Sequence, residues 1–248
     1  RCDIYTDVDG VYTTDPRIVP KARKLAKVTY EEMLELASVG AKVLQTRSVG
    51  LAMKEKVRVQ VLSSFTGEDA PMADTLPGTM IVGEEEVQVE RQLITGIAHD
   101  KNEAKIILTR VPDKPGAVAS IFTPLADAAI NVDMIIQVVS DDQATTDITF
   151  TVPAADYERA RTLLESLKEG IEYQALEGAT DVVKVSAIGV GMRSHAGVAA
   201  RAFRALAEKG INIRAITTSE IKFSVLIDAA YTELAVRTLH SLYGLDRA

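Results

Sequence analysis

The stretch KIILTRVPDKPGAVASIFTPLADAAINVDMIIQVV, residues 105–139, decides the fold, because the chain contains its pattern twice. Shifted by 81 positions, from 105 to 186, it falls without a gap on SAIGVGMRSHAGVAARAFRALAEKGINIRAITTSE, residues 186–220. The shared positions are apolar residues at helical spacing with one glycine and one asparagine: Ile107/Ile188, Gly116/Gly197, Ala119/Ala200, Phe122/Phe203, Leu125/Leu206, Ala126/Ala207, Ile130/Ile211, Asn131/Asn212 and Ile135/Ile216. Such positions set packing and turns. Two copies of this length predict two tandem domains, not a solenoid.

Each copy predicts the same order of elements, which is ferredoxin-like β-α-β-β-α-β. The first copy predicts strands at 105–110, 131–139, 146–152 and 172–176, with helices at 117–128 and 154–167. The second repeats this with 183–189, 197–208, 212–217, 222–227 and 231–242, but it has no clear final strand before the chain stops. Residues 92–99 are a candidate for that strand, and the first copy would then be an insertion within the second.

The residues before the repeats show a different pattern of expected strands and helices. Residues 3–7 are strand-like, and residues 30–41 carry apolar side chains at helical spacing. Thr29 is the expected N-cap of this helix, with Glu32 at the capping-box position. A short helix at 48–54 and an alternating strand at 57–62 follow.

Residues 63–90 are polar and rich in Gly and Pro, which is typical of a linker. One short strand is expected at 79–82, and the acidic run 84–86 is interpreted as a solvated turn. We therefore divide the chain into residues 1–66, a linker at 67–90, a first repeat at 91–178 and a second at 179–248. Residues 91–100 are the part that the second repeat can claim.

Bulk composition excludes several classes of function. The net charge is −7 with no dense Lys/Arg block, which argues against nucleic-acid binding. No apolar run reaches the roughly 18 residues of a membrane helix, and no secretory signal is visible. Cys2 is the only cysteine, and His99, His195 and His240 are scattered, so no metal site is expected. A reducing cytoplasm fits this composition. The chain opens at Arg1 and not at Met, so we expect it to be a fragment.

Several motifs resemble the aspartate kinase family. YTDVDGVYTTDPR, residues 5–17, is similar to its nucleotide-binding segment, and EMLELASVGAKVL, residues 32–44, to the helix and turn that follow. The ACT regulatory region of that family is matched by DKPG at 113–116, Gln137, TTDITF at 145–150 and TSE at 218–220. The resemblance implies the end of an α/β amino-acid-kinase domain followed by two α+β ACT domains. It also implies a cytoplasmic enzyme that phosphorylates L-aspartate with ATP and Mg²⁺ in lysine, threonine and methionine biosynthesis. The family's N-terminal Lys-Phe-Gly-Gly-type motif and its aspartate-binding residues are absent from this sequence.

For the first region the resemblance implies ATP contacts from Thr6, Asp7, Tyr12, Thr13, Thr14, Asp15, Pro16, Arg17 and Lys42. An aromatic ring beside adenine and cations beside phosphate suit phosphoryl transfer, which depends on positioning and electrostatics. An ordinary turn with a surface lysine is the alternative. We expect no catalytic residue and no bound ATP in this stretch alone.

The loop of the first repeat is a candidate effector site. In Asp113-Lys114-Pro115-Gly116-Ala117-Val118, Pro and Gly leave backbone amides free at a helix start, where an α-carboxylate can bind. Asp113 is placed to meet the ammonium group, and Gln137 offers a donor and an acceptor. A capped turn that binds nothing is the alternative.

The second repeat replaces this loop with Met192, Arg193, Ser194, His195, Ala196 and Gly197, so the two sites are expected to differ. Ser219 and Glu220 are candidates to receive a cationic side chain such as that of lysine. His195 is interpreted as a loop residue and not as a base, because no nucleophile–base–orienter set is present.

ACT domains of the family pack side by side and bind effectors at their interface. We expect Ile211 and Asn212 to complete the site opened by Asp113 and Gln137. Asn131, Val132 and Asp133 are expected to complete the site opened by Met192 and Ser194. Exposed strand edges favour a homodimer through these domains or a higher oligomer.

Three hypotheses of function follow. The first is the regulatory portion of an aspartate kinase that binds lysine, threonine or both as feedback inhibitors. The second is a stand-alone amino-acid-binding ACT subunit without catalysis, against which the kinase-like residues 5–44 speak. The third is an unrelated enzyme, against which the lack of a catalytic constellation speaks.

Overall fold

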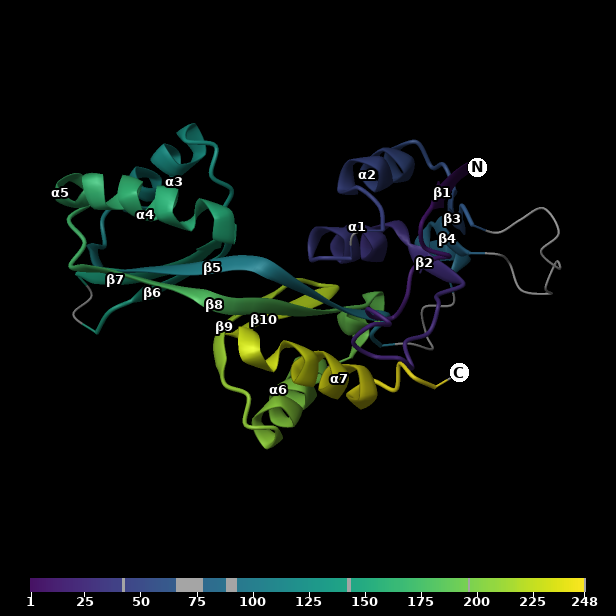
Figure 1. Ribbon diagram of the computed structural model, residues 1–248. Coiled ribbons are helices and arrows are strands. Elements are labelled where there is room, and N and C mark those ends of the chain that lie inside the picture. Colours follow the sequence, from purple (N-terminus) through teal and green to yellow (C-terminus); the bar gives the residue numbers. More distant parts are fainter. Residues whose placement is uncertain (42, 66–77, 88–92, 142–143, 196, 248) are drawn as a thin grey trace. The chain divides into compact units, whose positions relative to one another are not determined.

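The computed structural model describes residues 1–41, 43–65, 78–87, 93–141, 144–195 and 197–247 (Figure 1). The chain forms two compact units. Unit 1 contains Arg1–Asp100, Val185–Ile227 and Tyr231–Ala248, and unit 2 contains Lys101–Lys184 and Asp228–Ala230. Helices and strands mix in both, which confirms the predicted α+β class.

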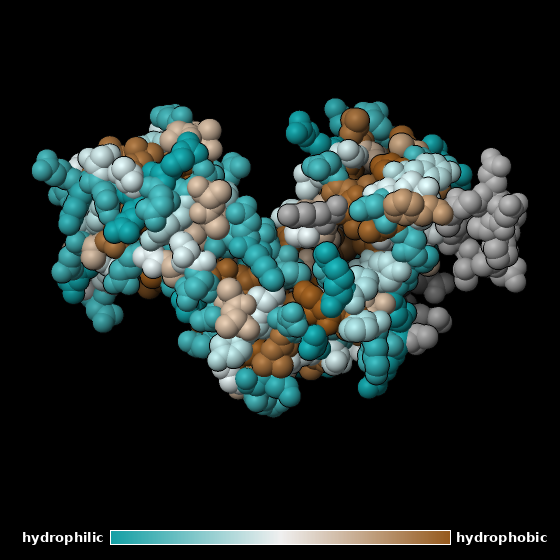
Figure 2. Space-filling model, viewed as in Figure 1, coloured by the Kyte–Doolittle hydropathy of each residue, from teal (hydrophilic) through white to brown (hydrophobic). Residues whose placement is uncertain are grey.

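The N-terminal part of unit 1 is a four-stranded sheet in the order β1-β3-β4-β2. Its strands are β1 (Cys2–Thr6), β2 (Lys27–Thr29), β3 (Val59–Ser63) and β4 (Thr79–Val82). β1 runs parallel to β3, β2 runs parallel to β4, and β3 and β4 are antiparallel. Two helices, α1 (Tyr30–Ser38) and α2 (Thr46–Lys54), pack on this sheet through a core that includes Met33, Leu36 and Val61. Leu51 and Met53 of α2 are exposed apolar residues. Figure 2 shows hydrophobic and hydrophilic surface side by side over these helices.

Helix α1 begins as its sequence predicts. The Thr29 side chain accepts a hydrogen bond from the Glu32 amide, and the Glu32 side chain accepts one from the Thr29 amide, so the capping box is complete. The helix ends at Ser38, earlier than predicted. Gly40 explains the difference, because its φ of +115° is left-handed and a Cβ there would lie 2.0 Å from the His99 carbonyl oxygen.

Strand β4 lies where the linker was expected to hold a strand, but its partners are strands of the N-terminal sheet. The turn before it depends on Gly78, which has a φ of +78° and whose Cβ would lie 1.8 Å from the Val61 carbonyl oxygen. The acidic run forms a 3₁₀ turn, η1 (Glu84–Glu86), with no buried residue, and Glu86 pairs with Arg58 at 2.9 Å. Residues 66–77 and 88–92 of the predicted linker lie outside the described residues.

The remainder of unit 1 is built from the second repeat. Strand order is β5-β8-β10-β9, with β9 (Ile213–Thr218) antiparallel to β10 (Lys222–Asp228). Helices α6 (Val198–Glu208) and α7 (Thr232–Leu242) cover this part of the sheet (Figure 1). Short 3₁₀ segments η4 (Val190–Ser194) and η5 (Ala229–Tyr231) precede the two helices. Phe203 of α6 meets Phe223 of β10 edge to face, with ring centroids 6.0 Å apart.

Unit 2 is built from the first repeat, with strand order β6-β7-β5-β8. Its elements are β5 (Gly96–Pro112), α3 (Ala117–Asp127), β6 (Asp133–Val139), β7 (Thr145–Val152), η3 (Ala154–Asp156), α4 (Tyr157–Ser166), α5 (Lys168–Ile171) and β8 (Ala175–Ile188). The helices lie on one face of the sheet (Figure 1), over a core that includes Ile106, Ile121, Phe150 and Leu164.

Strands β5 and β8 are longer than predicted. The strand expected at 105–110 is part of β5, and most of the strand expected at 183–189 belongs to β8. Of the strand expected at 172–176, only Ala175 and Leu176 belong to β8. Glu172 instead ends α5 in a left-handed conformation, with a φ of +64°. Residues 177–181 lie between the two predicted strands, but β8 continues through them, with the adjacent residues Glu177 and Gly178 exposed, and likewise Thr180 and Asp181.

Two backbone hydrogen bonds lie at opposite ends of the paired strands β5 and β8. The Thr95 amide donates to the Ile188 carbonyl at 2.7 Å, and the Gln174 amide donates to the Thr109 carbonyl at 2.9 Å. Among the described residues, no helix combines the length and the apolar character that crossing a bilayer requires.

Candidate nucleotide and effector sites

The kinase-like segment leaves β1 at the carboxyl end of that strand. Thr6 donates its hydroxyl hydrogen to Asp7 at 3.0 Å, and the Thr6 carbonyl accepts from the Ser64 amide at 2.8 Å. Since β1 and β3 are parallel, Thr6 and Asp7 lie at the edge of the sheet where open α/β folds bind ligands.

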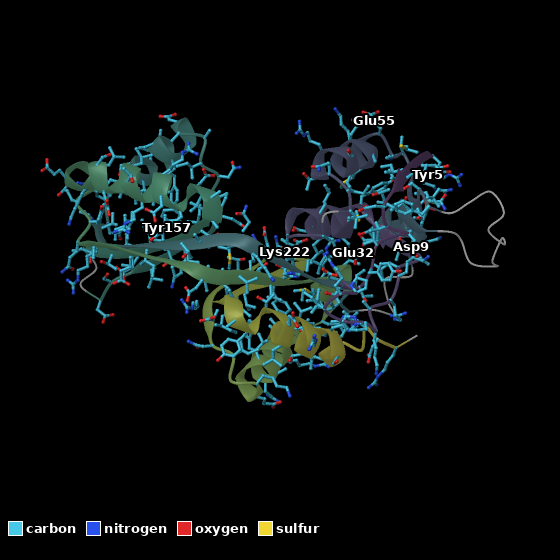
Figure 3. The ribbon with its side chains drawn as sticks, in the orientation of Figure 1. Tyr5, Asp9, Glu32, Glu55, Tyr157 and Lys222 are labelled. Atoms are coloured by element: carbon cyan, nitrogen blue, oxygen red, sulfur yellow. The ribbon has the colours of Figure 1, made fainter. Side chains whose placement is uncertain are left out.

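Asp9 organises the next turn (Figure 3). Its carboxylate accepts from the Tyr12 hydroxyl at 3.0 Å and pairs with Lys24 at 3.1 Å. Burial raises the pKa of the Asp9 carboxyl, but the hydrogen bonds from Lys24 and Tyr12 outweigh it and hold that pKa below its usual value. The Tyr12 ring is therefore held in place by its own loop.

Thr13 and Thr14 are buried. The Thr13 hydroxyl lies 2.9 Å from Nε2 of His240 and accepts from the Arg23 amide at 3.0 Å. The Thr13 amide donates to the Arg23 carbonyl, and its carbonyl accepts from the Ile97 amide. The polar groups of Thr13 therefore form their hydrogen bonds within the chain. This buried residue supports the kinase-like segment from the protein interior.

Asp15 and Arg17 form an exposed pair at 2.8 Å, and the hydrogen bond from Arg17 lowers the pKa of the Asp15 carboxyl. The Arg17 side chain is 90% exposed, and Pro16 is exposed beside it, so this guanidinium is accessible to an anion. Lys42 lies outside the described residues. Of the predicted ATP residues, Thr6, Asp7, Tyr12, Asp15, Pro16 and Arg17 are at least partly accessible.

The loop at 113–118 leads into α3 through a left-handed glycine. Gly116, at a φ of +93°, is the N-cap, and no side chain caps the helix. The Ala117 amide is bonded to the Lys114 carbonyl at 3.1 Å, so the open amides begin one residue later. Asp113, Pro115 and Val118 are exposed, and Lys114 pairs with Glu172 at 2.8 Å.

The corresponding loop of the second repeat has the same backbone feature. Gly197 has a φ of +84°, and α6 also begins without a side-chain cap. His195 places Nδ1 3.0 Å from the Gly191 carbonyl oxygen, and Met192 is half-buried. Nothing is described for the Ser194 side chain.

Arg193, a residue of this second loop, forms ion pairs with Glu84 at 3.2 Å and with Glu220 at 3.4 Å. Glu220, the predicted partner for a cationic ligand, therefore already faces a guanidinium, although its side chain is 82% exposed. The Ser219 amide donates to the Lys222 carbonyl at 2.7 Å.

The predicted strand-edge residues differ in exposure. Gln137 and Asn212 are exposed, whereas Ile211 is buried. In unit 2, Asn131 and Val132 line an open pocket of about 350 Å³ between α3 and the start of β6, together with Phe122, Ala126, Ala129, Ile130 and Ile135. The predicted pairings of Ile211 and Asn212 with the first loop, and of residues 131–133 with the second, link residues of different units and stay predictions.

Asp133 has a buried cation beside it. Lys184 of β8 donates to Asp133 at 2.7 Å and also pairs with Glu103 of β5. Burial lowers the pKa of the Lys184 ammonium, but the hydrogen bonds that it donates to Asp133 and Glu103 outweigh this effect and raise that pKa. This ammonium competes with any ligand for the Asp133 carboxylate.

Sequence reasoning missed four residues that organise these sites: Glu32 beyond its capping role, Lys184, Arg193 and His240. Each acts through a partner far away in the chain, and no local pattern announces such a partner. Of the four, only Lys184 could have been found from the sequence. A lysine within an otherwise apolar strand requires a buried counter-charge. No group of three or more potential metal ligands occurs in the described ranges.

Comparison with known protein families matches residues 1–63 to the amino acid kinase family, residues 105–169 to an ACT domain, and residues 185–243 to a second ACT-domain family. The aspartate kinase of Pseudomonas putida is 52% identical over 99% of this chain. The chain spans 58% of that relative's length.

Solved structures agree with these matches. A chain from a structure of aspartokinase alpha and beta subunits is 53% identical to this chain, with a TM-score of 0.57. The match covers 60% of this chain and 98% of that one. Escherichia coli aspartokinase III is similar in two states, each over 98% of this chain and 52% of that one. Its complex with aspartate and ADP gives 27% identity and a TM-score of 0.77, and its complex with lysine and aspartate gives 28% and 0.73. The chain therefore belongs to the aspartokinase family and carries the end of an amino acid kinase domain followed by two ACT domains.

Proposed function

We propose that this chain is the regulatory portion of an aspartokinase, which transfers the γ-phosphoryl group of ATP, with Mg²⁺, to L-aspartate. In this proposal the ACT domains bind a free amino acid, lysine or threonine, as a feedback inhibitor. The observation that carries it is the pair of uncapped helix starts at Gly116 and Gly197, because open amides at a helix N-terminus favour a carboxylate.

Two features favour this function over a stand-alone binding subunit. Residues 1–63 match the amino acid kinase family, and a module that only senses amino acids does not require them. Within the described part of this region, Tyr12 is held by Asp9 and the Arg17 guanidinium is exposed, which suits an aromatic contact to adenine and a cationic contact to phosphate.

Lysine is the best-supported effector, since the Escherichia coli relative was solved with lysine. A carboxylate or amide side chain of the protein must then accept hydrogen bonds from the amino groups of the lysine ligand. Asp113 and Gln137 are exposed in unit 2, and Glu220 is exposed in unit 1. Arg193 beside Glu220 weakens that carboxylate as a lysine receptor, so we assign the tighter lysine site to Asp113 and the threonine site to the second loop.

A homodimer through the ACT domains completes the proposal. β6 is the outer strand of unit 2, and it exposes Ile135, Val138 and Val139 by more than half of each side chain. An unpaired strand edge with exposed apolar residues favours pairing with a second chain.

Titration calorimetry with L-lysine and L-threonine tests the proposal. We expect at least one amino acid to bind, and Asp113→Ala to weaken lysine roughly tenfold, which corresponds to about 1.4 kcal/mol for one lost charge-assisted contact. Light scattering on the same samples checks the dimer.

Asp141→Ala is the matched control, because Asp141 is also an exposed aspartate of unit 2 but is not one of the proposed effector residues. It should leave the lysine affinity within about twofold. A folded, dimeric chain that gives no binding heat with either amino acid would exclude the effector role.

A further inference from the structure

A buried carboxyl group joins helix α1 to the loop of the second repeat (Figure 3). Glu32 is only 2% exposed. Its Oε2 accepts from the Thr29 amide at 3.2 Å and from the Thr29 hydroxyl at 3.1 Å, which is the expected cap. Its Oε1 accepts from the Thr95 hydroxyl at 2.6 Å and from the Val190 amide at 3.1 Å. One side chain thus serves both as a helix cap and as a link between distant segments of unit 1.

Val190 lies two residues before Met192, where the effector-loop candidate begins. It starts η4, which carries Met192 and leads through Gly197 into α6. The residue before it, Gly189, runs so close to residues 93–95 that a Cβ would lie 2.4 Å from the Leu93 carbonyl oxygen. The start of this loop is therefore fixed against the Thr95 segment, and Glu32 bonds to both.

The other end of α1 leads into the Gly40 turn, two residues before Lys42, a predicted ATP residue. The helix ends at Ser38 and is followed by the Gly40 turn, whose backbone packs on the His99 carbonyl. That turn is the one the family resemblance connects with ATP. A second link, between Glu35 of α1 and Lys222 of β10, measures 2.8 Å, but both side chains are more than a fifth exposed. The buried Glu32 link is the stronger one, because solvent screens exposed pairs.

The energetics favour two discrete arrangements over a gradual shift. If the loop moved away from Glu32, the buried Val190 amide would lose its acceptor, while Oε1 would keep only the Thr95 hydroxyl. A buried amide without a hydrogen-bond partner is costly. The loop and α1 therefore either move together or pay this penalty. Such an element can couple two sites, because each ligand biases the same equilibrium.

We propose that Glu32 is the positioning residue that transmits the state of the 190–197 loop to helix α1 and the turn after it. The inference rests on the proposed function, since it requires an amino acid to bind at this loop. Glu32 touches neither the amino acid nor the nucleotide in this scheme.

Hydrogen exchange of this chain, with and without saturating L-threonine, the amino acid that we assign to the second loop, tests the link. In the wild type, ligand should slow exchange at residues 190–200 and, by about fivefold or more, at residues 30–41, as expected for a coupling of 1 kcal/mol or above. Glu32→Ala removes both contacts of Oε1, the one with Thr95 and the one with Val190. It should preserve the slowing at 190–200 and reduce that at 30–41 to less than about twofold.

Two variants separate the link from the cap. Thr29→Ala removes the capping hydroxyl and leaves Oε1 untouched, and Glu32→Gln keeps an oxygen that can accept from Thr95 and Val190. Both should lower the melting temperature but retain the slowing at 30–41. If wild-type chain binds neither amino acid, the proposed function fails. If it binds threonine but residues 30–41 do not respond, or if Glu32→Ala transmits as well as the wild type, the link itself is wrong.

Discussion

His240 of α7 is fully buried and holds Thr13 of the kinase-like segment. Two further hydrogen bonds join the same two parts of the chain. The Arg23 guanidinium donates to the Leu245 carbonyl, and the Arg237 guanidinium donates to the Ile18 carbonyl, each at 2.9 Å. Unit 1 thus attaches its last helix to the segment that the resemblance connects with ATP. The Nδ1 atom of His240 has no hydrogen-bond partner among the described residues, so a charged ring would be poorly accommodated.

The buried imidazole predicts a pH-dependent stability. Burial lowers the pKa of His240 below its ordinary 6.5, so the unfolded chain takes up a proton at a higher pH than the folded one does. The free energy of unfolding therefore falls as the pH drops below about 6.5. Carboxyl groups with lowered pKa, such as Asp9 and Asp15, lose their contribution only at lower pH, near and below about 4.

His240→Leu should remove much of this loss. Urea unfolding at pH 7.5 and 5.5 should show a smaller decrease for the variant than for wild type, and at pH 7.5 the variant should be less stable by about 1 kcal/mol through the lost Thr13 bond. Thr13→Val is the control, because it removes that bond and keeps the titrating ring. If Thr13→Val and His240→Leu showed the same pH profile, another group would be responsible.

At the scale of elements, the ion pair between Lys184 of β8 and Glu103 of β5 fixes neighbouring strands of unit 2. Both side chains are about 5% exposed, whereas Asp133 of β6, which also pairs with Lys184, is 63% exposed. Buried charges need a partner, and an unpaired one is strongly destabilising. The pair therefore specifies how β5 and β8 align more than it adds net stability.

Lys184→Met should destabilise the chain by about 3–5 kcal/mol, because Glu103 stays buried without a cation. Lys184→Met combined with Glu103→Leu should recover most of this loss, since apolar side chains of similar volume replace the pair. Asp133→Asn should cost at most about 1 kcal/mol, as expected for an exposed partner. Urea unfolding of the three variants measures these differences. Equal losses in the single and double replacements would show that shape, and not charge, matters here.

The same contrast between local and distant partners explains what the sequence could predict. The Thr29–Glu32 capping box, the β4 strand and the glycine-led helices α3 and α6 were all predicted, because each depends on residues within a few positions of one another. Strands β5 and β8 were predicted as shorter pieces, because their polar stretches look like breaks until a neighbouring strand pairs with them. The second role of Glu32 and the buried positions of Thr13 and His240 were not predictable, since their partners lie 63 to 227 positions away.

At the scale of the molecule, two strands serve both repeats. β5 is the first strand of the first repeat, and its start, Gly96 to Asp100, belongs to unit 1, where it lies beside the end of β8. Strand order in unit 1 is then β5-β8-β10-β9, so the start of β5 adds a fourth strand beside β8, β10 and β9 of the second repeat. We infer that the first repeat is inserted within the second, with both crossings made by β5 and β8.

An insertion should be removable. Glu103 and Lys184 are ion-paired, so the two ends of residues 101–184 lie close together, and a short Asn-Gly turn between Asp100 and Val185 should close the gap. We expect the shortened chain to keep a single cooperative urea transition. The core of its N-terminal part draws on residues 11–98 and Ile188, and buried residues of its second repeat, such as Val198, Leu206 and Phe223, also lie outside 101–184. Residues 101–184 expressed alone should also unfold cooperatively, because the core of unit 2 lies wholly within 104–173. If neither piece folds without the other, the repeats form one cooperative domain and the insertion describes only the order of strands. If only residues 101–184 fold, unit 1 depends on the full length of β5 and β8, and the ligand-induced protection of α1 should be lost from the shortened chain as well.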